Sequence, residues 1–506
     1  MDKHAVVVCG GGPTGLMLAA ELALAGTDVA VVERRPNQDL PGSRAGGLHA
    51  RTIEVLDQRG IVDRFLSAGT TAQVASFAGT SIDISDFPTR HPYGLALWQN
   101  AFESILAEWV GELPVAFHRR EEVTDVTQDD DGAIVHLSGG RRLSAQYVVG
   151  CDGGRSVVRK AAGIAFEGWE PTTTSLIAEL RTREAPQLGI KRDARGQHGI
   201  GPIDGGDDGW VRVVVREAHA DDDAEPTLEA VREAMVEVWG TDFGAHDPRW
   251  ISRFGDGARQ AATYRAGRIL LAGDAAHVHS PVGGQGMGTG LQDAVNLGWK
   301  LAQVVTGSSP DSLLDTYGAE RHPVAARVIQ GTLAQTALMP DEPRIGAVRD
   351  IVASLLVDDA PRRRLGGMLS GLDLRYELGG RAVHPLVGRR MPDLDLETAS
   401  GPRTVFSFLH GGRPLLLELR DDANLDLGQP TPDSGRVQFI PATCRGPWEL
   451  PVLGTVAAPE AVLVRPDGHV AWTGSLDDPA LEVALETWFG SAASRAVVAQ
   501  LAAVAA

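Results

Sequence analysis

The chain is organised around Arg268-Ile-Leu-Leu-Ala-Gly-Asp-Ala-Ala-His277, a stretch that continues through Pro281 into Gly283-Gly-Gln-Gly-Met-Gly-Thr-Gly290. The pattern predicts a buried strand that breaks at Gly273-Asp274, a glycine-rich loop and then an amphipathic helix. A carboxylate at the end of a strand can accept hydrogen bonds from ligand hydroxyls. Glycines before a helix N-terminus let the backbone approach a planar group whose anionic edge the N–H dipoles favour. This combination suits the sugar-alcohol chain and the ring of a flavin.

A second glycine-rich motif lies near the N-terminus. The apolar run Ala5–Cys9 precedes Gly10-Gly-Gly-Pro-Thr-Gly15, a helical pattern and a second apolar strand that ends in Glu33. This order matches the dinucleotide-binding fingerprint, in which the glycines admit a pyrophosphate and the acid binds the hydroxyls of an adenosine ribose. The fingerprint does not separate FAD from NAD. The candidate cofactor-binding residues of this motif are Gly10, Gly12, Pro13, Thr14, Gly15, Glu33 and Arg34.

A third candidate site follows an expected antiparallel hairpin. The strand Tyr147–Cys151 ends in Asp152-Gly-Gly-Arg-Ser156, and Arg159 lies in the helix that follows. A carboxylate and an arginine at the carboxyl end of a strand lie where open α/β sheets bind ligands. Three more polar residues are candidate contacts to phosphate or to the cofactor ring, although the arginines could equally form surface ion pairs and the glutamine could cap a helix. They are Arg44, Arg51 and Gln99.

The charge of the chain disfavours several kinds of partner. Its 47 Lys and Arg residues against 66 Asp and Glu residues give a net charge of −19, which opposes binding to nucleic acid or to an anionic membrane. The apolar N-terminal run is interrupted by glycines, Pro13 and acidic residues, so we expect no signal peptide or membrane span and a cytoplasmic location. The partner that fits best is a small, mostly uncharged molecule.

The cysteine and histidine patterns do not indicate a metal site. The three cysteines are far apart in the sequence, so they predict neither a disulfide framework nor a metal knuckle. The pair His277-Val-His279 lacks the third and fourth ligands that a catalytic metal requires. We therefore expect no metal, and we interpret His277 as a residue that organises its loop.

The order of elements predicts an α/β protein of three units. A Rossmann-like unit with connecting helices is expected over 1–172 and 265–385. The β-rich segment 173–264 is interpreted as an inserted substrate-binding domain, because the parallel sheet resumes after it. Residues 386–506 resemble a small thioredoxin-like domain without Cys-x-x-Cys, so packing or homodimer formation is a simpler role for it than redox chemistry.

Taken together, the three motifs resemble those of the class A flavoprotein aromatic hydroxylases, the group of p-hydroxybenzoate and phenol hydroxylases. The segments 46–60, 148–156 and 466–472 look most like the hydroxylases of aromatic polyketides, notably angucyclines, and like the rifampicin monooxygenases. The matching motifs are Gly10-x-Gly12-x-x-Gly15 with Glu33, Asp152-Gly153-x-x-Ser156-x-x-Arg159, and Gly273-Asp274-Ala-Ala-His277-x-x-x-Pro281.

This resemblance implies a fold, two cofactors and a reaction. The fold would be the p-hydroxybenzoate hydroxylase fold with FAD bound and NADPH as a transient co-substrate. Reduced flavin would take O2 to a C4a-hydroperoxide and transfer one oxygen to a polycyclic aromatic polyketide. Glu33 would bind the adenosine ribose, Arg44 and Gln99 the FAD, and Asp274 the ribityl chain, while Asp152 and Arg159 would lie between FAD and NADPH.

The loop around the flavin ring is expected to act through its backbone, by excluding water and by contacting the reacting edge of the ring. Its candidate catalytic residues are Pro281, Gly284 and Gly286, and Met287 and Gly288 complete the cofactor contacts there. Baeyer–Villiger oxygen insertion, inactivation of a rifamycin-like antibiotic and a non-catalytic flavin-binding role remain alternatives.

Overall fold

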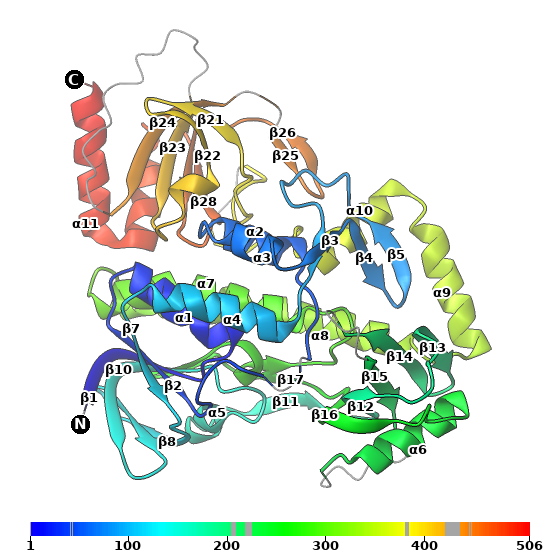
Figure 1. Cartoon of the computed structure of the whole chain (residues 1–506). Helices are drawn as coiled ribbons and strands as arrows, with labels where there is room; N and C mark the ends of the chain where they lie inside the picture. Colours follow the sequence, from blue (N-terminus) through cyan, green and yellow to red (C-terminus); the bar gives the residue numbers. More distant parts are fainter. Residues whose placement is uncertain are drawn as a thin grey trace.

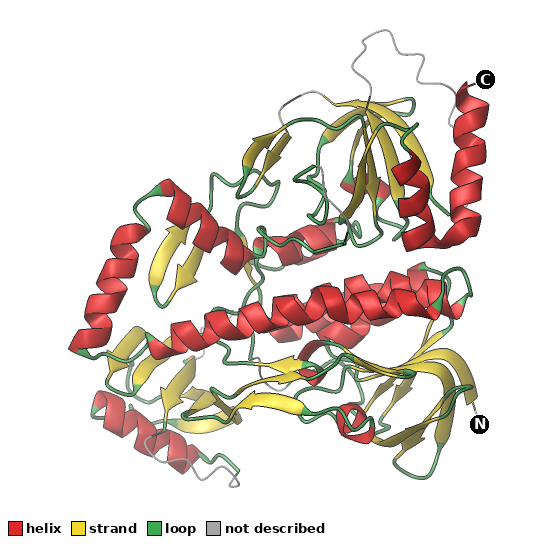
Figure 2. Cartoon of the chain, turned by 180° about the vertical axis from the view of Figure 1, so that it is seen from behind, coloured by secondary structure: helices red, strands yellow, loops and turns green. Residues whose placement is uncertain are grey.

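The computed structural model describes residues 2–40, 42, 44–203, 209–217, 225–379, 384–419, 436–444, 446 and 448–505. Figure 1 shows three lobes: a parallel sheet with its helices near the N-terminus, a second sheet beside it, and a C-terminal lobe above both. The long helices α7 (Gly286–Val305) and α8 (Asp315–Ala337) run between the C-terminal lobe and the other two (Figures 1 and 2). The predicted α/β fold class is confirmed.

The first lobe is built on a sheet in the order β18-β19-β10-β1-β2-β7, and its five strands from β19 to β7 are parallel. The central part of the sheet, formed by residues 6–9, 29–32 and 147–149 and by β19, is apolar and buried on both faces, as parallel sheets covered by helices require. Helix α1 packs against α7 and α4 on one side of this sheet. The bounds are β1 Asp2–Cys9, α1 Pro13–Leu24, β2 Val29–Glu33, α4 Gln99–Gly111, β7 Val115–Arg119, β10 Arg142–Gly150, β18 Arg265–Ala266 and β19 Ile269–Leu271, with the antiparallel hairpin β8 Val123–Gln128 and β9 Ala133–Leu137 attached to β10.

Shorter elements complete this lobe and its connections. A small sheet of β11, β17 and β20 joins residues on both sides of the predicted boundary at 172, so the first two lobes share hydrogen-bonded strands. The bounds are α2 Ala50–Asp57, α3 Val62–Leu66, β3 Thr70–Ala72, β4 Val74–Phe77, β5 Thr80–Asp83, β6 Gly94–Ala96, α5 Val157–Ala161, β11 Phe166–Trp169, β17 Ala258–Ala261, the 3-10 turn η1 Gly273–Ala275, β20 His277–Val278, the 3-10 turn η2 Asp311–Leu314, α9 Pro343–Leu355 and α10 Asp359–Ser370.

The second lobe is a five-stranded sheet in the order β13-β14-β15-β12-β16 with one helix, α6, packed on it. Alternation along β12 and β15 places Leu176 and Val213 beneath α6, while Arg212 points to the opposite face, where it lies 3.8 Å from the ring of Trp98. That opposite face therefore looks toward the first lobe. The bounds are β12 Thr174–Arg181, β13 Gly189–Asp193, β14 Gly196–Pro202, β15 Trp210–Arg216, α6 Leu228–Trp239 and β16 His246–Gly255.

The C-terminal lobe has a six-stranded sheet in the order β22-β21-β24-β23-β27-β28, in which β23 and β24 are parallel. Helix α11 packs on it and is kinked at Gly490, where φ is 80°. The turn between β27 and β28 points into the first lobe. The bounds are β21 Asp395–Thr398, β22 Gly401–Thr404, the 3-10 turn η3 Phe406–Phe408, β23 Leu415–Leu419, β24 Gln438–Cys444, β25 Trp448–Leu450, β26 Gly454–Val456, β27 Ala461–Val464, β28 Val470–Gly474 and α11 Pro479–Ala505.

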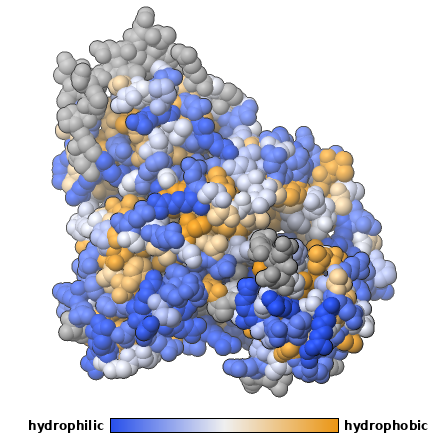
Figure 3. All heavy atoms as spheres, in the orientation of Figure 1, coloured by the Kyte–Doolittle hydropathy of each residue, from blue (hydrophilic) through white to orange (hydrophobic). Residues whose placement is uncertain are grey.

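The surface is mostly hydrophilic on the face drawn in Figure 3, with apolar residues gathered toward its middle. In the ranges that the structure describes, no helix combines the length and apolar character needed to span a membrane.

Candidate functional site

The first part of the site is the glycine turn between β1 and α1. Gly10 has φ 107°, and a side chain there would overlap the backbone carbonyl of Cys151, while one at Gly15 would overlap the carbonyl oxygen of Gly10. At Gly12, by contrast, no described atom lies within 4 Å of the position a Cβ would take. Gly12 is the N-cap of α1, and among the described residues no side chain caps this helix. The fold thus requires Gly10 and Gly15, whereas Gly12 borders open space that suits a pyrophosphate.

Glu33, at the carboxyl end of β2, is oriented by the same turn. One oxygen accepts a hydrogen bond from the N–H of Gly11 at 2.7 Å, and the other accepts from the backbone N–H and Nε of Arg35 at 2.9 and 3.0 Å. Arg35 and Gln99 each donate to Glu103, both at 2.9 Å. Burial raises the pKa of Glu33, but these bonds lower it more, so the carboxyl is ionised at neutral pH. Glu33 is therefore a hydrogen-bond acceptor beside the open turn.

Three predicted arginines have contrasting surroundings. Arg34 is exposed and forms no hydrogen bond or ion pair within the part of the chain described, while its neighbour Arg35 binds Glu33. Arg44 is exposed as well and donates to Ser252 of β16 at 2.7 Å, so it connects the first two lobes. Arg51 donates to the carbonyl of Gly371 at 3.1 Å. Arg51 is therefore used in packing, whereas the cofactor contacts of Arg34 and Arg44 stay predictions.

Asp152 follows the carboxyl end of β10 and Arg159 lies in α5, the next helix, as predicted, and each already has partners. One oxygen of Asp152 accepts from the N–H of Val157 at 2.7 Å, while its Oδ1 is buried without a hydrogen-bond partner among the described residues. Arg159 donates to the carbonyl of Ala275 at 2.9 Å and lies over the ring of Phe166 at 3.8 Å. Arg159 therefore holds the η1 turn against α5, and direct contact between its guanidinium and a cofactor stays a prediction.

Asp274 lies in η1, immediately after β19. Its carboxylate is exposed and has no hydrogen-bond partner in the described ranges, so its oxygens are available to a ligand. The adjacent Gly273 and, across the turn, Gly290 of α7 both lie against Thr14 of α1, with no room for a Cβ. The first and third sequence motifs are thus in direct contact.

The loop before α7 exposes its backbone. Pro281 and Gly284 are exposed, and Gly283 and Gly284 have φ values of 84° and 64°, which favour glycine. His49 contacts the carbonyl of Gly283 at 2.7 Å, and burial lowers the pKa of this imidazole despite that bond, so it is neutral and donates to the carbonyl. A half-buried, neutral histidine therefore holds the loop at Gly283.

The first turn of α7 follows this loop without a side-chain cap among the described residues. Among the described residues, a Cβ at Gly286 would meet only the ring of His279, at 3.6 Å, whereas one at Gly288 would overlap Thr52. Met287 packs against the core of the first lobe. Gly286 thus leaves space beside N–H groups that point out of the helix, the arrangement that binds an anionic ring edge.

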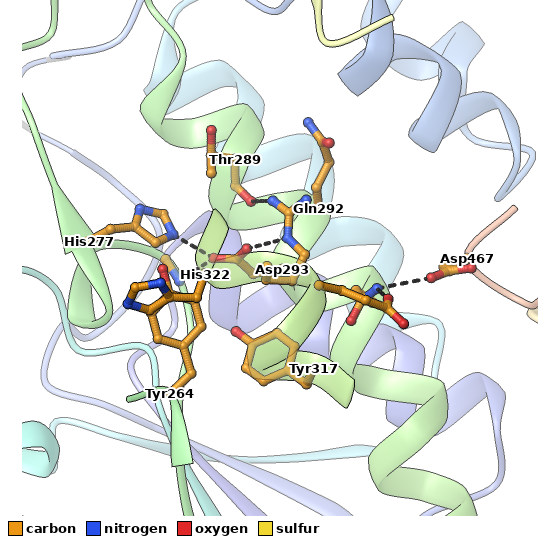
Figure 4. Close-up of polar contacts among 12 residues, drawn as sticks. Tyr264, His277, Thr289, Gln292, Asp293, Tyr317, His322 and Asp467 are labelled. Atoms are coloured by element: carbon orange, nitrogen blue, oxygen red, sulfur yellow. Dashed lines mark hydrogen bonds and ion pairs between the residues drawn. The ribbon is translucent and has the colours of Figure 1, made fainter. Parts of the chain in front are cut away.

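A buried network centred on Asp293 holds the loop from inside (Figure 4). Its Oδ2 contacts Nε2 of His277 at 2.6 Å and accepts from the N–H of Gly273 at 3.1 Å, and its Oδ1 accepts from Nε of Arg321 at 2.7 Å. Burial raises the pKa of Asp293, but Arg321 and His277 lower it more. The carboxylate is therefore ionised and joins η1 to α8 through α7.

The two histidines of His277-Val-His279 have separate partners. His277 contacts Asp293, as expected of a residue that organises its loop, and Nδ1 of His279 contacts the carbonyl of Ser280 at 2.8 Å. Burial lowers the pKa of His279, so its ring is neutral and Nδ1 donates this bond.

Sequence reasoning missed Arg35 and the Asp293–Arg321 pair. Arg35 lies two positions after the fingerprint acid, and only the folded chain shows that it, rather than Arg34, contacts Glu33. The Asp293–Arg321 pair did have a signal in the sequence, because polar residues recur at helical spacing on the otherwise apolar, glycine-rich helix α7. That row consists of Thr289, Asp293, Asn296 and Lys300, all buried in the structure.

These parts lie at one edge of the parallel sheet. The carboxyl ends of β1, β2, β10 and β19 meet there, because all four strands run in the same direction. The edge presents, in order, an ionised acid, an open glycine turn, a free aspartate and an uncapped glycine loop. An extended dinucleotide with a hydroxylated linker and a planar ring could contact these groups in the same order along the edge.

Two family models match the chain. One, described as an FAD binding domain, matches residues 3–332. The other, described as the C-terminal part of aromatic-ring hydroxylases, matches residues 384–492.

Curated relatives match along nearly the whole chain. The 12-dehydrotetracycline 5-monooxygenase/anhydrotetracycline 6-monooxygenase of Streptomyces rimosus is 41% identical, with 96% of this chain and 99% of the relative covered. The rifampicin monooxygenase of Streptomyces venezuelae is 42% identical, with the same coverage of both chains.

Solved structures share the fold at similar identity. An aromatic hydroxylase from angucycline biosynthesis superposes with a TM-score of 0.86 at 41% identity, over 96% of this chain and 99% of the other. The Diels-Alderase of pyrroindomycin biosynthesis superposes with a TM-score of 0.82 at 37% identity, over 97% and 100%.

Proposed function

The chain belongs to the FAD-binding aromatic-ring hydroxylases, and on that premise we propose that it is an NADPH-dependent monooxygenase that hydroxylates a polycyclic aromatic polyketide. The observation that carries the proposal is the exposed glycine loop before α7, which lies beside the free carboxylate of Asp274. Relatives named for tetracycline, rifampicin and angucycline chemistry support the substrate class.

FAD fits the residues of this edge. Glu33 would bind the adenosine ribose, the N–H groups behind Gly12 the pyrophosphate, and Asp274 the ribityl hydroxyls. The unpartnered Oδ1 of Asp152 is a further acceptor at the same edge. When bound, FAD would supply the redox chemistry: it would accept electrons from NADPH and activate O2.

The protein's own contribution is positioning and exclusion of water. The uncapped N–H groups at the start of α7 would stabilise the anionic edge of the ring, and the loop from Pro281 to Gly288 would shield the reacting face. The face of the second sheet that looks toward the first lobe includes Ile177, Val214 and Phe254, which are buried or half-buried. These apolar side chains suit one side of a flat, apolar ring system.

A second candidate function is catalysis without oxygen transfer. It is favoured by the pyrroindomycin Diels-Alderase, which shares this fold at 37% identity and is named for a cyclisation. Baeyer–Villiger insertion and inactivation of a rifamycin-like compound use the same proposed site and differ only in the substrate and in the bond that receives oxygen.

The test is oxidation of NADPH by the FAD-loaded protein with tetracycline-type, angucycline-type and rifamycin substrates, followed by mass spectrometry and NMR of the products. We expect faster NADPH oxidation with an angucycline-type or tetracycline-type ring system and a product 16 mass units heavier, oxidised at a ring carbon. Oxygen within a lactone would assign Baeyer–Villiger chemistry instead. A product of unchanged mass, formed without NADPH, would replace the proposal by the cyclase function.

A further inference from the structure

The turn 465–469 between β27 and β28 of the C-terminal lobe is buried between α7 and α8. Arg465 donates to both oxygens of Glu320 at 2.8 and 2.7 Å, and Asp467 accepts from Asn296 of α7 at 3.1 Å. Arg465, Asp467 and Glu320 are all buried, at 0%, 2% and 5% exposure. Charges buried this completely hold one arrangement, because any displacement leaves a charge without its partner.

Two residues of the first lobe, just after the C-terminal end of α2, contact the same turn. Arg59, which is paired with Glu21 of α1, donates to the carbonyl of Pro466 at 3.0 Å. The side chain of Gln58 packs against Gly468, where a Cβ would overlap it. The turn is thus held on several sides by helices of the first lobe.

From this turn a continuous path of contacts leads to the cofactor loop. The ring of His469 stacks on Tyr376 with centroids 4.2 Å apart, and the hydroxyl of Tyr376 accepts a hydrogen bond from Nη1 of Arg321 at 3.1 Å. Arg321 donates through Nε to Asp293, whose other oxygen holds the N–H of Gly273 and the ring of His277. Figure 4 shows the end of this path at Asp293.

The orientation of Arg321 decides how Asp293 is presented to η1. Arg321 is fully buried, and its described contacts are with Asp293, with the carbonyl of Thr289 at 3.1 Å and with Tyr376. Removing the hydroxyl of Tyr376 leaves one of these buried donors unpaired, which makes the observed orientation less favourable. Because Asp293 bonds directly to Gly273, that change would reach the residue next to Asp274.

We propose that Tyr376 is a positioning residue for the flavin loop, and that through it the C-terminal turn sets how tightly and in what geometry the first lobe holds FAD. This rests on the proposed placement of the flavin beside Gly273–Gly288. It gives the C-terminal lobe, which has no Cys-x-x-Cys motif, a role in organising the cofactor site.

The test compares Tyr376→Phe with Tyr147→Phe. Tyr147 is also a buried tyrosine whose hydroxyl is hydrogen-bonded, to Asp311 at 2.5 Å, but it does not contact Arg321 or Asp293. In each purified full-length variant, FAD is removed and rebound, its Kd is measured by fluorescence, and the visible spectrum of the bound flavin is recorded. We expect about a tenfold higher Kd and a shifted spectrum for Tyr376→Phe only.

A second pair separates positioning from loss of structure. His469→Phe keeps a ring against Tyr376 and should keep the wild-type Kd and spectrum, whereas His469→Ala removes the ring and should resemble Tyr376→Phe. Equal Kd values and spectra for Tyr376→Phe and Tyr147→Phe would overturn the proposal, as would equal values for the two His469 variants. Neither readout needs turnover, so a wild-type protein that binds FAD but oxidises nothing would refute the proposed function and leave this test intact.

Discussion

Replacing Gly12 by alanine should separate cofactor binding from folding. Gly12 has φ −77° and ψ −174°, which alanine adopts freely, and no described atom lies within 4 Å of the new Cβ. The apo protein should therefore keep its stability to within about 0.5 kcal/mol. The methyl group would instead occupy the space assigned to the pyrophosphate. We expect FAD affinity to fall at least about tenfold, equivalent to about 1.4 kcal/mol.

Two other glycines provide the comparison. Alanine at Gly15 would overlap the carbonyl oxygen of Gly10, so Gly15→Ala should destabilise the fold by about 3 kcal/mol. Gly111, at the end of α4, is exposed and, like Gly12, has open space at its Cβ position, so Gly111→Ala should leave both properties unchanged.

The assay pairs urea denaturation of the apo proteins with fluorescence titration of FAD. Gly12→Ala should show a wild-type denaturation midpoint and a raised Kd, while Gly15→Ala should show a lowered midpoint. A wild-type Kd for Gly12→Ala would refute the inference that the pyrophosphate passes this residue. A Kd for Gly111→Ala raised as far as that of Gly12→Ala would refute it too, because the effect would not be local.

Three further outcomes are expected. Asp274→Ala removes an exposed carboxylate without a described partner, so it should leave apo stability unchanged and lower FAD occupancy after purification; full occupancy would contradict its role. Gly286→Val should fold, because its Cβ meets only His279 at 3.6 Å, yet lower substrate-stimulated NADPH oxidation about tenfold or more, and wild-type rates would contradict a close approach of the ring there. Burial raises the pKa of Glu320, but the positive charges of Arg465 and Lys300 outweigh burial and lower the pKa from 4.5 to about 2. The ionised carboxylate therefore contributes its full stabilisation above pH 4.5. About 3 kcal/mol of that stabilisation is lost as the pH falls toward 2. Urea midpoints from pH 2 to 7 should show that fall and a flatter profile in Glu320→Gln, and parallel profiles would contradict the assignment.

Much of this protein was determined by local sequence pattern. The glycine turn after β1, the acid at the end of β2 and the break at Gly273-Asp274 each follow from a few neighbouring residues, because backbone conformation and hydrophobic period are local properties. The same holds for the expected antiparallel hairpin before Tyr147–Cys151, which the structure forms from β8 and β9. The motifs together were specific enough to indicate the family.

What the sequence left open depends on which side chains meet. Arg34 and Arg35 are adjacent and identical in type, yet only Arg35 reaches Glu33, because consecutive residues leave the backbone in different directions. Arg159 was a candidate cofactor contact. In the fold its guanidinium donates to the carbonyl of Ala275 in η1 and to the carbonyl of Gly154 in the loop before α5.

The sequence by itself determined the cofactor-binding motifs and the order of the lobes, since each is encoded over a short span. Only the tertiary structure decided that the C-terminal turn lies beside α7 and that Tyr376, Arg321 and Asp293 form one path to the flavin loop. Those contacts join residues 28 to 171 positions apart in the chain, and one sequence carries no local signal for such pairs. They exist because buried charges must find partners wherever the packed helices bring them together.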